Sequence, residues 1–117
     1  MSTSAKSPVQ SADTESMLDE ITRKIVEAFQ PERVILFGSY AYGIPEWDSD
    51  IDLLVIMHTQ DRPAERSVRI ARVCRPRYVA MDILVRTPEE VVQRLEEFDP
   101  FFEEIMTRGR VLYEAAR

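Results

Sequence analysis

Two aspartates stand one residue apart at the start of the most apolar stretch of the chain. Asp50 and Asp52 open the segment Asp50–Met57, whose other residues are all Ile, Leu, Val or Met. Side chains alternate along a strand, so both carboxylates are expected on one face, with Cα atoms roughly 7 Å apart. Unpaired carboxylates beside a core repel each other and lose hydration. A hard cation would relieve both costs, and Mg²⁺ prefers one or two carboxylates together with substrate phosphates.

A third aspartate interrupts another apolar segment. Tyr78–Val85 carries Asp82 among aliphatic residues. If this segment is a strand beside the first one, Asp82 completes a carboxylate triad, and metal ions held there could clamp the attacking and leaving oxygens of a phosphoryl transfer. By itself, one Asp-x-Asp pair is usually a strand-end cap or a solvated turn. Three acids at two strand starts favour the metal site.

Gly38-Ser39 supplies a second kind of chemistry. Glycine allows the backbone to approach a ligand closely, and amides at a turn that opens a helix can bind a phosphate. By itself the pair is only a tight turn. It is not a Walker A loop, because no Gly-Lys-Ser/Thr follows.

Hydrophobic periodicity predicts the elements that position these residues. Gly38–Gly43 is a turn from which a short helix can begin, and Val111–Tyr113 is either a small edge strand or a docked tail. Thr87-Pro88-Glu89-Glu90 is a capping box that starts a helix with Val91, Leu95 and Phe98 toward the core. We predict helices at Met17–Phe29, Arg62–Arg75, from Thr87 and from Asp99 to Arg108, and strands at Arg33–Phe37, Asp50–Met57 and Arg77–Val85. The order predicts a small α/β (α+β) fold, in which helices pack on a sheet of at least three strands.

Composition limits the class of protein. The 117 residues fit one domain, expected at 16–117 after a polar, disordered tail at 1–15. A single cysteine excludes an internal disulfide, and neither a signal peptide nor an apolar run of membrane-spanning length is present, so we expect a cytoplasmic protein. The net charge of −6 argues against direct nucleic-acid binding, although residues 62–77 hold six arginines and one acid.

The combined pattern resembles a known family. Gly38-Ser39, ten intervening residues and then Asp50-Ile51-Asp52 resemble the signature of the nucleotidyltransferases of the DNA-polymerase-β superfamily. The stretch GSYAYG…SDIDLLV is most similar to the minimal nucleotidyltransferases, the small stand-alone members, and RGRVLYE near the end also fits them. The resemblance spans roughly Leu18 to Glu114 and implies the polymerase-β-like fold, with a small mixed sheet.

The resemblance also implies roles for the residues. Gly38 and Ser39 would hold the nucleotide's phosphates, Asp50 and Asp52 would bind Mg²⁺, and Asp82 would be the third metal ligand and help to activate a hydroxyl. The reaction would transfer a nucleoside monophosphate, AMP from ATP in the leading interpretation, to that hydroxyl. Many relatives have arginine where this chain has Tyr42, which puts the strength of nucleotide binding in question.

Small members of this family suggest a partner. Stand-alone minimal nucleotidyltransferases are often antitoxins of helical HEPN-type toxins, and some add AMP to a tyrosine of the toxin. A protein adenylyltransferase acting as such an antitoxin is therefore the leading hypothesis. Two alternatives stay open: an antitoxin that neutralises its toxin by binding alone, and a nucleotidyltransferase subunit that acts on a small molecule or RNA.

Overall fold

The computed structural model describes residues 12–46 and 49–116, which form nine helices and strands. In chain order they are α1 (Ala12–Phe29), β1 (Arg33–Phe37), α2 (Ser39–Tyr42), β2 (Ile51–Ile56), α3 (Pro63–Cys74), β3 (Met81–Arg86), α4 (Pro88–Glu96), α5 (Pro100–Arg108) and β4 (Arg110–Glu114). No helix in this part of the chain is both long and apolar enough to cross a membrane.

The four strands form one mixed sheet in the order β3-β2-β1-β4. β1 is antiparallel to both β2 and β4, whereas β2 and β3 run parallel. This arrangement confirms the predicted small mixed sheet with helices. Of the two alternatives for Val111–Tyr113, the structure has the edge strand.

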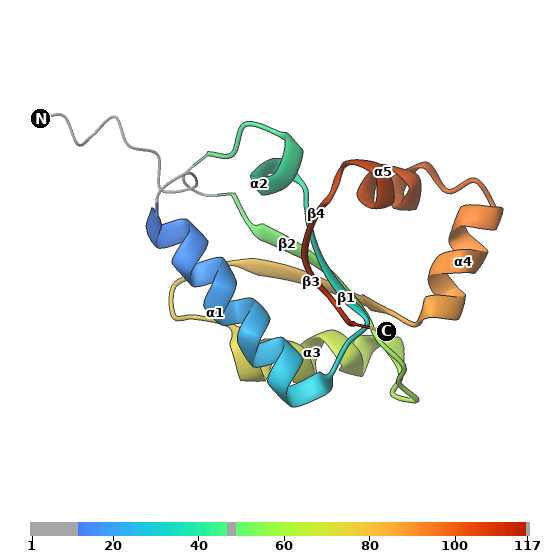
Figure 1. The fold of residues 1–117 in the computed structure, drawn as a ribbon, viewed down its shortest axis with the longest axis horizontal. Helices are drawn as coiled ribbons and strands as arrows, with labels where there is room; N and C mark the ends of the chain where they lie inside the picture. Colours follow the sequence, from blue (N-terminus) through green and yellow to red (C-terminus); the bar gives the residue numbers. More distant parts are fainter. Residues whose placement is uncertain (1–11, 47–48, 117) are drawn as a thin grey trace, which may run out of the picture.

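Helices cover both faces of the sheet (Figure 1). One core cluster joins α1 and α3 to the face that carries Ile51, Leu53 and Val55, and a second joins α4 and α5 to the face of Leu54 and Ile56. Every residue of β2 except Asp52 is buried. The continuous apolar run of this strand therefore reflects burial on two faces, as predicted.

The first helix begins earlier than predicted. α1 starts at Ala12, five residues before Met17, and Glu15 in its first turn forms an ion pair with Arg110 of β4 (2.6 Å). Residues 12–15 of the predicted tail are thus helical, because a contact 95 residues away in sequence anchors them. The remainder of that tail, 1–11, lies outside the described residues.

Two further expectations were wrong in detail. β3 begins at Met81 instead of Arg77, because pairing with β2 starts at Met81 opposite Ile51, and Tyr78 before it has a φ of 63° that no strand accommodates. Phe98 does not face the core. α4 ends at Glu96, and Phe98 follows in a left-handed conformation (φ 59°) with 79% of its surface exposed.

Candidate functional site

Asp52 lies in the middle of the sheet with a neighbour on each side. On β1 its register partner is Phe37, so the Gly38-Ser39 turn begins directly beside it. On β3 its register partner is Asp82. The sheet thus brings together two predicted halves that are distant in sequence, the glycine-serine turn and the aspartates.

The three aspartates belong to the same side of the sheet. Asp52 and Asp82 lie two residues before Leu54 and Leu84 on their strands, so they share the face of these leucines. Leu54 and Leu84 face α4 and α5. Asp50 precedes β2 by one residue, Asp50 and Asp82 are exposed, and Asp52 is partly buried. The acids therefore stand where β2 and β3 begin, at the end of the sheet where α2 also lies (Figure 1).

Gly38 makes a close approach that no other residue type permits. Its φ is 74°, and a Cβ atom added to it would lie 2.2 Å from Oδ2 of Asp52. The carbonyl of Gly38 accepts the N–H groups of Ala41 and Tyr42 (both 3.0 Å), which closes the single turn of α2. N–H groups of a first helical turn have no partner within their helix, so the turn presents donors next to the Asp52 carboxylate.

Electrostatic repulsion is built into this group of carboxylates. Burial, followed by the charges of Asp82 and Asp50, raises the pKa of the Asp52 carboxyl from 3.8 to about 6. Burial and the charge of Asp50 likewise raise the pKa of the Tyr40 hydroxyl, which places this α2 residue near the same acids. A positive ligand would relieve this repulsion.

The oxygen donors fit a hard divalent cation in type. All three are carboxylates on one side of the sheet. The charges of Asp50 and Asp82 both contribute to the raised pKa of the Asp52 carboxyl. In residues 12–46 and 49–116, no group of three or more His, Cys, Asp or Glu side chains is arranged as a metal site. Asp50, Asp52 and Asp82 thus stay predicted metal ligands.

The raised pKa of Asp52 predicts how stability depends on pH in EDTA. Between about pH 4 and about pH 6 the folded protein keeps a proton that the unfolded chain has released, so the free energy of unfolding should fall as pH rises. The carboxyl is partly exposed, so screening limits this loss to about 1 kcal/mol. Asp52→Asn should abolish it in urea unfolding, whereas Asp13→Asn, an exposed residue of α1, should keep it. Identical pH profiles for wild type and Asp52→Asn would contradict the assignment.

One neighbour of the site escaped the sequence analysis. The guanidinium of Arg108, at the end of α5, lies 4.6 Å from the centroid of the Tyr42 ring and donates to the Tyr42 carbonyl (3.4 Å). A positive charge therefore reaches α2, although the chain has Tyr42 at the position where the family resemblance implies arginine. No local pattern could have indicated it, because the two residues are 66 positions apart.

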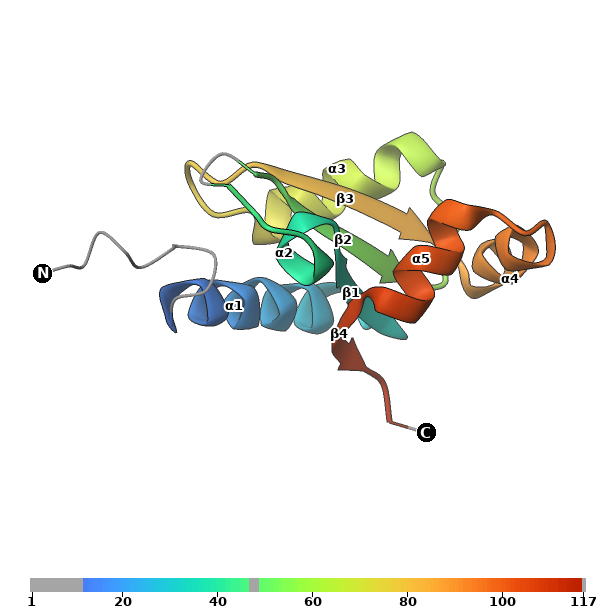
Figure 2. The ribbon, with the colours of Figure 1, turned by 90° about the horizontal axis from the view of Figure 1, so that it is seen from above.

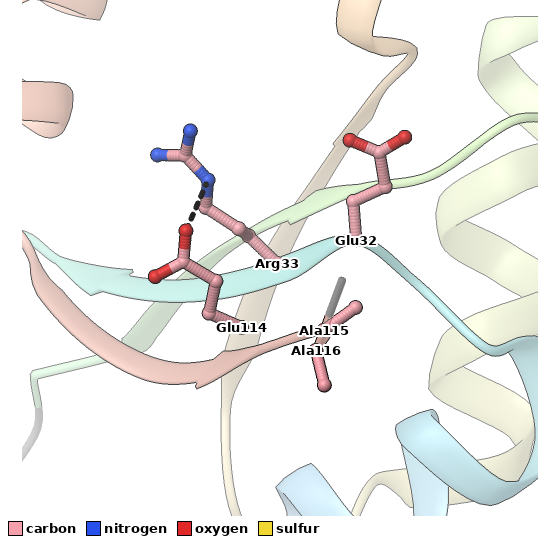
Figure 3. A pocket seen from close by; sticks show the side chains of 5 residues that line it. All are labelled: Glu32, Arg33, Glu114, Ala115 and Ala116. Atoms are coloured by element: carbon pink, nitrogen blue, oxygen red, sulfur yellow. Dashed lines mark ion pairs between the residues drawn. The ribbon is translucent and has the colours of Figure 1, made fainter.

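A pocket elsewhere on the sheet contains none of these residues. Glu32, Arg33, Glu114, Ala115 and Ala116 line it, and Arg33 and Glu114 form an ion pair across it (3.7 Å; Figure 3). It lies where β1 begins and β4 ends, whereas the aspartates gather where β1 ends. Its lining lacks the grouped carboxylates and the glycine turn, so we place the candidate site at Asp52.

Comparisons with known proteins show the family and the fold of the chain. The family model described as "Polymerase beta, Nucleotidyltransferase" matches residues 19–117. A crystal structure from Sulfolobus solfataricus, of a protein described only provisionally as a nucleotidyltransferase, has a TM-score of 0.63 and 21% identity, over 94% of this chain and 91% of that one. No curated protein matches the sequence. The fold is thus shared with that structure, and the chain belongs to the polymerase-β family of nucleotidyltransferases.

Proposed function

We propose that the protein transfers a nucleoside monophosphate, AMP from ATP, to a hydroxyl group with the help of Mg²⁺. The observation that carries this proposal is the position of Asp52, between the Gly38-Ser39 turn on one side and Asp82 on the other. Members of this family commonly use a divalent metal ion with a nucleoside triphosphate. The grouped carboxylates and the turn beside them are the two parts that such a substrate requires.

The chemistry assigns a task to each part. N–H groups of the Gly38-Ser39 turn would bind phosphate oxygens, and Asp50 and Asp52, with Asp82 as the third ligand, would hold Mg²⁺, which when bound stabilises the negative charge of the triphosphate. The acceptor oxygen attacks the α-phosphorus, the bond from that phosphorus to the oxygen shared with the β-phosphate breaks, and pyrophosphate leaves. Asp82, the outermost of the three, takes the proton of the acceptor hydroxyl.

For the acceptor we propose a tyrosine of a helical HEPN-type toxin, which would make the protein an antitoxin. Support for this step comes from the resemblance to stand-alone minimal nucleotidyltransferases that act in this way. Tyr42 in place of the usual arginine favours a second candidate, an antitoxin that works by binding alone. The contact between Arg108 and Tyr42 favours the catalytic candidate, because it returns a positive charge to α2.

Calorimetric titration of ATP into the protein tests the catalytic candidate. We expect binding in Mg²⁺ that disappears in EDTA and in Asp50→Asn/Asp52→Asn, because these carboxylates hold the metal. The matched control is Asp13→Asn/Asp19→Asn, which removes the same charge from exposed positions of α1 and should bind as wild type does. Absence of ATP binding in a folded wild-type protein would contradict the catalytic candidate. It would favour the second candidate, the antitoxin that works by binding its toxin alone.

A further inference from the structure

The loop between α3 and β3 holds an exposed basic and aromatic surface, Arg75, Arg77 and Tyr78. We infer that this surface binds an acidic protein segment around the acceptor hydroxyl, an inference that rests on the proposed function. Ala80, at the end of the loop, accepts a hydrogen bond from the N–H of Ile51 (2.9 Å), directly between Asp50 and Asp52. The loop lies at the end of the sheet that carries the aspartates (Figure 2).

The direction of the reaction places the acceptor on this side. In phosphoryl transfer the attacking and leaving oxygens lie roughly in line on opposite faces of the phosphorus. The Gly38-Ser39 turn, which would hold the leaving phosphates, borders Asp52 from β1, whereas Asp82 borders it from β3. The acceptor therefore approaches over β3, and the loop leads directly into that strand.

The arginines of the loop are available to a partner. Within the described residues, Arg66 pairs with Glu90 and Arg69 with Asp61, but Arg75 and Arg77 form no ion pair. The guanidinium of Arg77 lies 6.0 Å from the centroid of the Tyr78 ring. Exposed arginine beside an aromatic ring is the composition typical of the centres of protein interfaces.

The backbone of the loop holds Tyr78 outward. Val79 packs against the core of the α1–α3 face, whereas Tyr78 is 98% exposed and has a φ of 63°, which is rare for an aromatic residue. Val79 thus anchors the chain directly after Tyr78, and the ring stays in solvent. Such strain at an exposed position indicates a binding role for that position.

The charge distribution favours a short acidic protein segment over a nucleic acid. Residues 62–77 carry a local charge of +5, whereas the whole chain carries −6. The rest of the chain has an excess of acidic residues, which repels the many phosphates of a long nucleic-acid strand. A few carboxylates around one tyrosine match the small basic surface.

Fluorescence anisotropy with a labelled copolymer of glutamate and tyrosine tests this inference. We expect wild type to bind it at least tenfold more tightly than a lysine–tyrosine copolymer or a thymidine oligonucleotide. Arg77→Glu should weaken binding at least tenfold. The matched control is Arg62→Glu, an equal charge change at an exposed arginine at the other end of α3, about 18 Å away, and it should have less than a twofold effect.

Titration of the same variants with Mg²⁺ and ATP separates the inference from the proposed function. Arg77→Glu should bind ATP as wild type does; lost ATP binding would assign the loop to the nucleotide and overturn the inference. Equal weakening by Arg62→Glu and Arg77→Glu, or tighter binding of the oligonucleotide, would also overturn it. A wild-type protein that binds the acidic copolymer but no ATP would keep the surface as a site for an acidic protein segment, and would reject the proposed transfer together with the acceptor role of that segment.

Discussion

Gly38→Ala is expected to lose at least a hundredfold in affinity for ATP with Mg²⁺ and to lower the free energy of unfolding by about 1–2 kcal/mol. Two physical reasons combine. The backbone of Gly38 has a φ of 74° and a ψ of −157°, a region that is essentially confined to glycine and costs a residue with a Cβ atom at least about 1 kcal/mol. The new Cβ would also lie 2.2 Å from Oδ2 of Asp52, so the carboxylate would have to leave its position.

The same close contact allows a sharp control. In the double variant Gly38→Ala/Asp52→Ala the carboxylate is gone, and the nearest remaining atom is Cβ of residue 52, at 3.4 Å. The cost of Gly38→Ala in urea unfolding should then fall to the roughly 1 kcal/mol of the backbone term. An equal cost in both backgrounds would show that the contact with Asp52 is not important. Unchanged ATP affinity in Gly38→Ala would exclude the turn from the nucleotide site.

Arg66→Ala is expected to be the most destabilising of the single arginine substitutions, at about 3 kcal/mol. The Arg66 side chain is only 7% exposed and contacts both carboxylate oxygens of Glu90 (2.7 and 3.3 Å). It also donates to the carbonyls of Asp61 (3.0 Å) and Val85 (3.3 Å). Its removal would disconnect α3 from the end of β3 and from α4, and would take the buried positive charge away from the Glu90 carboxylate.

Arg69→Ala is the matched control for this experiment. Arg69 lies one turn further along α3, and its ion pair with Asp61 is largely exposed, so its loss should cost less than about 1 kcal/mol. Arg66→Lys should fall between the two, because lysine keeps the charge but not the two-pronged contact. Equal destabilisation by Arg66→Ala and Arg69→Ala, measured by urea unfolding, would contradict a special role for burial at Arg66.

The Arg66 example shows what a linear pattern leaves undecided. In the sequence Arg66 is one of six similar arginines, any of which could be solvated or functional. The fold buries this one and leaves Arg69 and Arg72 of the same helix exposed, because α3 turns a single face toward β3 and α1. The position of a helix face relative to distant elements is a tertiary property.

Local patterns, by contrast, were sufficient for the elements and for the family. The box of Thr87 and Glu90 starts α4 as predicted, since both of its hydrogen bonds form within four residues (2.9 and 3.2 Å). The alternation of side chains along β2 separates Asp52 from Ile51 and Leu53 for an equally local reason. Gly38-Ser39 and Asp50-Ile51-Asp52 indicated a nucleotidyltransferase, which the family match over residues 19–117 confirms.

The sequence by itself therefore determined the acidic and glycine motifs, the family and most helices and strands, but not where α1 and β3 begin or whether Val111–Tyr113 is a strand. Only the tertiary structure decided that Asp82 lies beside Asp52, that Gly38 touches its carboxylate and that the Arg75–Ala80 loop ends next to Asp50. The physical reason is that helix and strand periods arise from neighbours in sequence. Strand order and register instead depend on burying both faces of the whole sheet at once, which links residues such as Asp52 and Asp82 across thirty positions.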